Sequence, residues 1–276
     1  MTIVIHAKSY DVCLMTTLIK NIRYFPVKGL AGIDLPCVQL TAGQALPQDR
    51  RFALALGSTP IDQAEGEWMA KTFFLMLARN EKLATLETAY DQESEILTVS
   101  RKGRQVSRGK LTDTIGRAMI EEFFDAYMGD EARGRPKVIE GTPERPMSDI
   151  DSAVVSLINL ASVRDIERIT GKPVNPNRFR GNIMFEGETP WIEHDWIDQD
   201  IQIGDVRLNI FKRTRRCAAT EVNPETAARD MSLLKALKMG FEHTDCGVYA
   251  RVEIGGLVSE GDIIIPPNPW TTPEVL

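Results

Sequence analysis

The sequence predicts a mainly β protein with a few helices, an α+β fold divided into two units. Short apolar segments ended by Gly, Pro or Asp recur in both halves of the chain, a pattern typical of strands joined by tight turns. One long helical pattern lies between the halves, over residues 111–128, and a glycine-rich, charged stretch at 129–136 follows it as an expected linker. We therefore place the first unit at residues 15–130 and the second at residues 136–267.

Strand-like segments dominate the first unit. Several of them hold apolar residues at roughly alternating positions, as a strand with one buried face requires. Short strands at this spacing favour a barrel or a sandwich. The expected strands cover residues 18–26, 32–40, 51–56, 84–90 and 96–100.

The helix at residues 111–128 follows these strands. Apolar residues recur every four positions from Ile115 onward, so they share one helical face. Asp113 or Thr112 can cap the N-terminus of this helix, and Gly129 can end it.

The second unit is expected to mix strands with two short helices. The first of these helices would begin with Ser162 as its cap and end near Gly171. The second would run from Ala227 to Met239 and close at Gly240. The expected strands cover residues 154–159, 182–185, 200–204, 206–211, 247–252 and 262–265.

Composition excludes several classes of protein. The chain has 276 residues, of which 26% are charged, and its formal net charge is −6. Broad nucleic-acid binding is not expected of an acidic chain, because the phosphate backbone attracts basic surfaces. No apolar run approaches the ~20 residues that cross a bilayer, and residues 1–19 lack the features of a secretory signal. We expect a cytoplasmic protein that binds neither nucleic acid nor membranes, with Met1 or Met15 as its natural start.

Cys217 carries the strongest chemical signal in the sequence. It follows the run Lys-Arg-Thr-Arg-Arg at residues 212–216, directly after an expected strand. Four cations within these five residues favour a thiolate, the form of cysteine that binds metals or reacts. The alternative is a small buried hydrophobe, which is what we expect of Cys13, Cys37 and Cys246. No two cysteines have the spacing of a common zinc or iron–sulfur site.

Other polar residues supply candidate anion sites. Arg178 and Arg180 alternate, so an extended strand would turn both guanidinium groups to one face, flanked by Asn177 and Asn182. The alternative is a pair of solvated arginines on an edge strand. The helix start at Ser162 offers free backbone N–H groups, although Ser162 can equally be a plain cap.

Several of these segments together resemble a known family. Phe-Pro-Val-Lys at residues 25–28 and Asp-Arg-Arg-Phe at 49–52 resemble the N-terminal β-barrel domain that precedes a MOSC domain. MOSC is the C-terminal domain of molybdenum cofactor sulfurase, and its family includes the mitochondrial amidoxime-reducing component and bacterial relatives. The resemblance covers nearly all of residues 17–265. Segments similar to the MOSC domain itself, in the family's order, are residues 177–182, 203–206, 216–217, 223–226, 247–252 and 261–262.

The resemblance implies a fold, a cofactor and a set of site residues. An N-terminal β-barrel-like domain would pack with a MOSC β-barrel domain that carries a few helices. The cofactor would be the molybdenum cofactor (molybdopterin), with Cys217 as the catalytic residue and the protein ligand to the metal. The residues implied to hold its phosphate and pterin are Lys28, Arg51, Ser162, Arg164, Asn177, Arg178, Arg180, Asn182 and Arg216.

Three functions follow as hypotheses. The first is an oxidoreductase that reduces N-hydroxylated or N-oxide-type small molecules with electrons from a separate flavin or iron–sulfur protein. The second is a non-catalytic carrier of sulfur, as a persulfide on Cys217, or of the molybdenum cofactor. The third is a binding module with a degenerate site.

Overall fold

The computed structural model describes residues 17–61 and 68–267. Met15 and Cys13 therefore lie outside the described residues, and the choice between Met1 and Met15 stays a prediction. The α+β class is confirmed: the described chain is mostly strands, with three α-helices. None of the helices in these two ranges is long and apolar enough to span a membrane.

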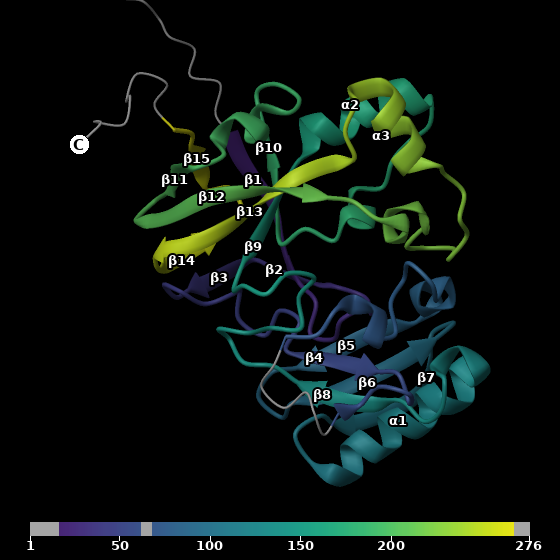
Figure 1. Ribbon diagram of the computed structural model, residues 1–276. Helices are drawn as coiled ribbons and strands as arrows, with labels where there is room; N and C mark the ends of the chain where they lie inside the picture. Colours follow the sequence, from purple (N-terminus) through teal and green to yellow (C-terminus); the bar gives the residue numbers. More distant parts are fainter. Residues whose placement is uncertain (1–16, 62–67, 268–276) are drawn as a thin grey trace, which may run out of the picture.

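A closed seven-stranded barrel takes six of its strands from the second unit (Figure 1). Its strands follow the order β10-β9-β13-β12-β11-β15-β1, and β1 pairs with β10 to close the circle. β2 (Ile33–Leu35) extends from β1 as an eighth strand outside the circle. The barrel strands are β1 (Thr17–Tyr24), β9 (Val155–Asn159), β10 (Ile183–Glu186), β11 (Gln199–Ile203), β12 (Val206–Arg215), β13 (Asp245–Ile254) and β15 (Ile263–Ile265).

The first described strand, β1, lies in the N-terminal half of the sequence but forms part of this barrel. Ile19, Ile22 and Tyr24 of β1 are buried in the barrel core, and β1 pairs with both β10 and β15. Closure removes the two open edges that the remaining six strands would expose. The division at residues 15–130 and 136–267 stays a prediction, and β1 crosses it.

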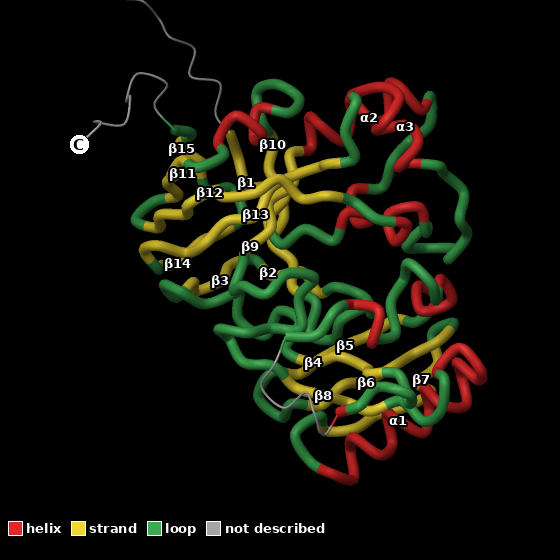
Figure 2. The backbone as a smooth tube through the Cα atoms, viewed as in Figure 1, coloured by secondary structure: helices red, strands yellow, loops and turns green. Residues whose placement is uncertain are grey.

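The remaining strands are divided among small sheets (Figure 2). β4 (Phe52–Ala55) pairs with β8 (Lys137–Glu140), and β3 (Cys37–Leu40) pairs with β14 (Gly256–Ser259). A three-stranded meander supports α1 (Thr114–Met128) on one face. The meander consists of β5 (Glu87–Asp91), β6 (Ile96–Arg101) and β7 (Arg104–Lys110).

The helices begin and end where their caps allow. Asp113 caps α1 by accepting a hydrogen bond from the Gly116 amide, as expected. α2 (Leu160–Thr170) is capped by Asn159 rather than by Ser162, which lies inside the helix.

The last helix, α3 (Leu233–Phe241), is shorter than expected. The sequence predicted a start at Ala227, but Ala227 has a φ of 60°, and a left-handed residue cannot continue a right-handed helix. The left-handed residue that ends α3 is Glu242, rather than Gly240.

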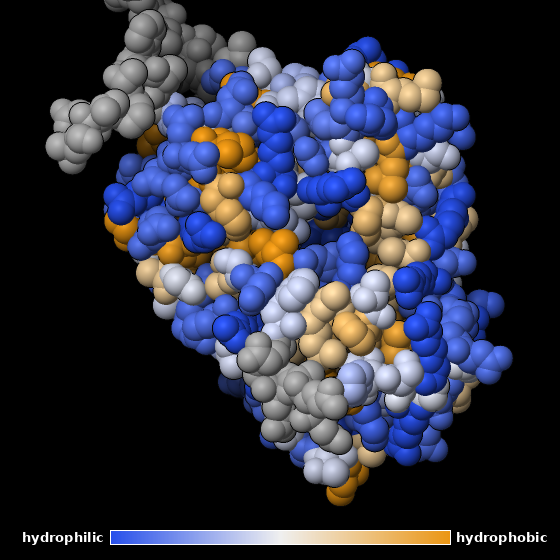
Figure 3. Space-filling model, viewed as in Figure 1, coloured by the Kyte–Doolittle hydropathy of each residue, from blue (hydrophilic) through white to orange (hydrophobic). Residues whose placement is uncertain are grey.

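Hydrogen bonds to backbone carbonyls join the two units at a central junction. Arg50 donates to the Arg180 carbonyl at 3.0 Å, and Arg180 donates to the Leu30 carbonyl at 2.8 Å. Arg229 reaches across from the second unit to the Ala78 carbonyl at 2.9 Å. Figure 3 shows a hollow between the two parts of the molecule, with hydrophilic side chains around it.

We expect Ile22→Ala to lower the free energy of unfolding by about 2–5 kcal/mol, because it removes a fully buried side chain from the barrel core. Urea unfolding measures the change. The control is Lys20→Ala at an exposed position of the same strand, which should stay within about 0.5 kcal/mol of wild type. Equal losses in the two variants would show that β1 does not complete the barrel.

Candidate functional site

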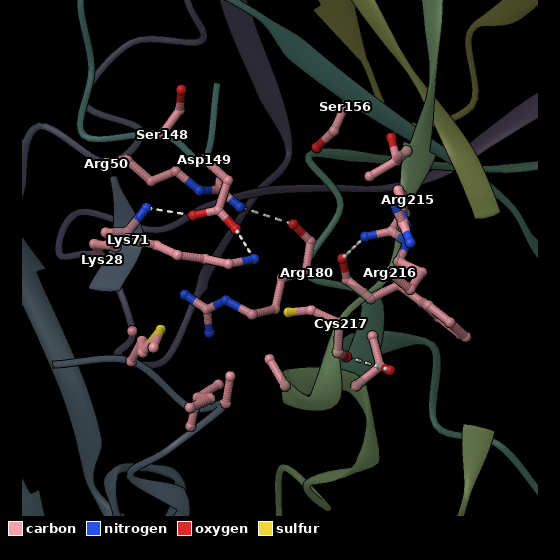
Figure 4. A pocket seen from close by; sticks show the side chains of 18 of the residues that line it. Lys28, Arg50, Lys71, Ser148, Asp149, Ser156, Arg180, Arg215, Arg216 and Cys217 are labelled. Carbon is pink, nitrogen blue, oxygen red and sulfur yellow. Dashed lines mark hydrogen bonds and ion pairs between the residues drawn. The ribbon is translucent and has the colours of Figure 1, made fainter. Parts of the chain in front are cut away.

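A cavity of about 120 Å³ lies at the junction of the two units (Figure 4). Seven cationic residues line it, against two carboxylates. Six of these cations are buried or half-buried, and Arg215 is exposed. Such an excess of positive charge favours an anionic ligand. The cations are Lys28, Arg50, Lys71, Arg178, Arg180, Arg215 and Arg216, and the acids are Asp49 and Asp149.

Cys217 lies at the wall of this cavity, two residues after the end of β12. Its carbonyl accepts hydrogen bonds from the amide and the hydroxyl of Thr220, both at 3.0 Å, which fixes the turn that follows it. Figure 4 shows the sulfur pointing into the space bordered by Lys71 and Arg180. Cys217 is partly exposed. The expectation of an accessible sulfur beside an opening is therefore met.

The other two described cysteines differ from Cys217. Cys246 is fully buried, and burial raises the pKa of its thiol to about 12, as suits the small hydrophobe expected from the sequence. Cys37 is exposed on β3, so the expectation of a buried residue is wrong there, because alternation on this edge strand turns its side chain outward.

Asp149 bridges two lysines inside the cavity. Its carboxylate lies 2.5 Å from the Lys28 ammonium and 3.3 Å from the Lys71 ammonium. Burial opposes ionisation of Asp149, but Lys28 and then Lys71 outweigh it, so the pKa of the carboxyl lies below its usual range. Burial lowers the pKa of Lys28, against the opposing effect of Asp149.

Lys71 and Asp149 were not predicted from the sequence. Lys71 pairs with Asp149 and also contacts Cys217; these two neighbours outweigh the effect of burial and raise its pKa. Neither residue lies in a recognisable motif: Lys71 begins a short 3₁₀ helix at Lys71–Phe73, and Asp149 lies in a loop. Only the fold brings them to the sulfur.

Arg50 and Arg180 lie against the same aromatic ring. Their guanidinium carbons are 4.8 Å and 4.2 Å from the centre of the Phe25 ring. Arg50 is paired with Asp49, whereas Arg180 forms no ion pair among the residues that the structure describes. Burial, and next the proximity of Arg50, lower the pKa of Arg180 to about 9. An anion beside Arg180 would relieve this repulsion.

Arg178 and Arg180 line the cavity, but the backbone that carries them is not the strand that was predicted. The expected strand is a 3₁₀ turn at Pro176–Phe179, and Arg180 follows it with a φ of 52°. The turn buries Arg178, which donates to Asp230 at 2.6 Å. The alternative of two solvated arginines is thereby excluded, although the strand prediction was wrong.

Two buried polar atoms at the cavity have no hydrogen-bond partner. They are Nε of Arg178 and Oγ1 of Thr214, and both residues line the cavity. Buried polar groups in proteins are nearly always paired, so unpaired ones at a cavity indicate where a ligand or water would bond.

Asn182 and Arg216 line the cavity but direct their hydrogen bonds into the protein. The Asn182 side chain accepts from the Ser156 hydroxyl at 2.8 Å and donates to the Arg23 carbonyl at 3.1 Å. Arg216 donates to the Phe179 carbonyl and, through Nε, to the Cys246 carbonyl, both at 2.8 Å. Both residues hold the wall in place.

The structure corrects the placement of Arg51. Its guanidinium group lies outside the cavity lining and forms ion pairs with Glu95 at 2.9 Å and Glu140 at 2.7 Å. The preceding residue, Arg50, lines the cavity instead. Arg50 has a φ of 51°, so the chain turns at this residue and the two neighbouring side chains diverge.

The anion site expected at the start of the helix after β9 is already filled by a carboxylate of the protein. Glu193 is fully buried there and accepts hydrogen bonds from Ser162 and Asn159, both at 2.9 Å. Burial raises the pKa of Glu193. Arg164 pairs with Glu186 on the surface. Ser162 and Arg164 thus lie away from the cavity, contrary to the placement expected.

Asn177 lines a second cavity, of about 540 Å³, rather than the first. The two cavities share part of their walls, including Arg178, Arg180 and Ala219. Of the ten residues singled out from the sequence, the first cavity thus brings together Lys28, Arg178, Arg180, Asn182, Arg216 and Cys217.

No cluster of three or more His, Cys, Asp or Glu side chains suited to a metal ion occurs within residues 17–61 and 68–267.

We expect Asp149→Asn to lower the free energy of unfolding at pH 7 by about 1–3 kcal/mol, because the buried Lys28 ammonium loses its charged partner. Since the folded pKa of Asp149 is lowered, the contribution of its carboxylate is present above the unfolded pKa of ~3.9 and is lost as the pH falls through the folded pKa. Urea unfolding at neutral pH and in strong acid should show two curves that differ at pH 7 and converge in acid.

The control is Asp151→Asn, at an exposed position two residues later, which should change stability by less than about 0.5 kcal/mol. If Asp149→Asn lowered the free energy of unfolding at pH 7 no more than the control does, Asp149 would not be the partner that stabilises the buried Lys28.

Comparison with known proteins supports the assignment made from the sequence. Residues 139–265 match the family model of the MOSC domain. Human mitochondrial amidoxime-reducing component 1 is 27% identical over 129 residues, which cover 47% of this chain and 37% of that protein. The molybdenum cofactor sulfurase of Drosophila mojavensis is 28% identical over 123 residues, covering 44% of this chain and 15% of that protein. The matched parts are thus a minority of the length of these curated relatives.

The YuaD protein of Bacillus subtilis is a solved structure that is similar over most of the chain. It is 13% identical, with a TM-score of 0.42, and the likeness covers 91% of this chain and 94% of that one. The family match covers less than half of the chain and lies where most strands of the closed barrel lie: residues 139–265 of this chain are similar to the MOSC domain family.

Proposed function

We propose that the chain binds the molybdenum cofactor in the first cavity and acts as an oxidoreductase on N-hydroxylated or N-oxide-type small molecules. Electrons would come from a separate flavin or iron–sulfur protein. The observation that carries the proposal is the partly exposed Cys217 beside an excess of cations. The names of the relatives, an amidoxime-reducing component and a molybdenum cofactor sulfurase, support the same chemistry.

The residues of the cavity fit such a cofactor on two counts. A phosphorylated group would meet Lys71 and Arg180, where positive charge exceeds negative charge. The unpaired polar atoms of Arg178 and Thr214 would gain partners from a polar ring system or from phosphate. The enclosed volume, about 120 Å³, is smaller than the ~300–1,000 Å³ of a typical organic-ligand site. It therefore suits the charged end of a ligand rather than the whole of one.

Each side chain has a defined part in this proposal. Cys217 would bind the metal through its sulfur, Arg180 and Lys71 would hold the anionic end, and Asp149 would keep Lys28 and Lys71 in place. When bound, the cofactor supplies a metal centre that exchanges oxygen and electrons with the substrate. In the overall reaction, an N–OH group would take up two protons and two electrons to give N–H and water. The partner protein would supply the two electrons and be oxidised.

The first test removes the sulfur. We expect Cys217→Ala to abolish molybdenum binding and reductase activity while changing stability little, because Cys217 is not part of the core. Elemental analysis of freshly purified protein measures the metal, and Cys37→Ala, at an exposed cysteine, is the matched control. Molybdenum retained in Cys217→Ala would contradict the proposal. A persulfide on Cys217 in wild-type protein without molybdenum would favour the sulfur carrier instead.

The second test removes one cation. We expect Lys71→Gln to lower the amount of pterin that copurifies with the protein by about fivefold to tenfold, the effect of losing ~1–1.4 kcal/mol of a charge-assisted contact. Fluorescence of the released and oxidised pterin measures the content. Lys172→Gln, at an exposed position far along the chain, is the control. Equal pterin content in the two variants would exclude Lys71 from the binding site.

A further inference from the structure

The second cavity differs in character from the first. Its volume, about 540 Å³, lies within the range of sites that enclose small organic molecules. It lies between the two units and shares a wall with the cationic cavity at Gly29, Leu77, Arg178, Arg180 and Ala219. Ala219 is two residues from Cys217, so a molecule in the second cavity would lie close to the proposed reaction centre.

Buried apolar side chains lie at the base of the second cavity, among a lining that also includes polar residues. Apolar walls with a few polar groups are typical of pockets for organic ligands. These side chains belong to Phe25, Leu30, Leu83, Leu86 and Val222, each of them at most 2% exposed. Asn177 adds an amide with which a polar group of the ligand can hydrogen-bond.

The charges of the second cavity are distributed differently from those of the first. Two exposed carboxylates, Glu87 and Glu225, line it, and neither forms an ion pair among the described residues. Of its three arginines, Arg23 is neutralised by Asp34 at 2.6 Å and Arg178 by Asp230 at 2.6 Å. Arg180, in the shared wall, is left as the inner positive charge.

We propose that the second cavity binds the body of the substrate, an apolar small molecule that is neutral or carries a basic nitrogen. The apolar walls would hold the body, the rim carboxylates would favour a cation over an anion, and Arg180 would face the oxygen-bearing end. The assignment to a substrate rests on the proposed function. The phosphate of the cofactor is the poorer occupant, because it would lie beside two carboxylates that no cation of the described residues neutralises.

Binding of three probes of similar size to the full chain, purified without cofactor, tests the proposal. Benzylamine is a cation at neutral pH, benzyl alcohol is neutral and benzoate is an anion. We expect saturation-transfer NMR titrations to show benzylamine binding about threefold to fivefold more tightly than benzoate, the size of an exposed charge effect of up to ~1 kcal/mol. Glu225→Gln should reduce that ratio. Benzoate binding as tightly as benzylamine, or no binding of benzylamine, overturns the proposal.

Filling the cavity gives a second, independent readout. We expect Ala84→Trp and Thr88→Trp, which enter the cavity from different elements, each to weaken benzylamine binding by about tenfold or more. Ala89→Trp, an exposed neighbour on the strand of Thr88, is the control and should bind as wild type does. Unchanged binding in both filled variants overturns the assignment.

The same variants separate a substrate site from a cofactor site. Bound pterin, measured after expression with molybdenum, should be equal in wild type, Ala84→Trp and Thr88→Trp. A loss of pterin in both filled variants would assign the second cavity to the cofactor and overturn the proposal. If wild-type protein binds benzylamine but never molybdenum, the proposed function fails while the binding site stands, so the two failures are distinguishable.

Discussion

The concentration of positive charge beside one sulfur atom is the constraint on which the rest of the site depends. Seven cations and two carboxylates share a small cavity. Like charges in a low-dielectric space repel, and the lowered pKa of Arg180 records that repulsion together with burial. Asp149 offsets part of it by bridging two lysines. An anion in the cavity would offset the remaining excess, and this is the physical basis for proposing a phosphorylated ligand there.

The fold creates this concentration by bringing distant segments to one junction. The first described strand crosses from the N-terminal part of the chain into the barrel, so the loop that follows it carries Lys28 to the barrel's end. Left-handed residues at Arg50 and Arg180 turn the chain where both guanidinium groups meet Phe25. The same junction separates a strongly cationic cavity from a larger one with a mixed apolar and polar lining. The proposed reaction brings an anionic cofactor and an apolar substrate into contact, so it needs a cationic cavity next to a cavity that accepts the substrate.

Sequence reasoning succeeded where several residues act together in a local pattern. The pair Arg178 and Arg180 was identified from spacing, although it lies on a turn and not on a strand. Of the basic run before Cys217, Arg215 and Arg216 line the cavity, whereas Lys212 and Arg213 are exposed outside its lining. It failed for Arg51, because a single backbone angle decides which way the side chain points. Arg50 is left-handed, so the side chain of Arg51 turns away from the cavity and pairs with Glu140. It also failed at Asp149, because a lone charge in a loop carries no signal until the tertiary fold gives it neighbours.

The alternation of apolar residues predicted most strands but could not show that β1 closes the barrel, because strand pairing is a long-range property.

The central claim is that Cys217 is the protein ligand to molybdenum. Anomalous diffraction at the molybdenum absorption edge, from crystals of protein expressed with molybdenum, tests it most directly. We predict a single strong anomalous peak within bonding distance of the Cys217 sulfur, at the edge of the cationic cavity. A fully occupied peak elsewhere in the molecule, with the sulfur of Cys217 left uncoordinated, would contradict the account.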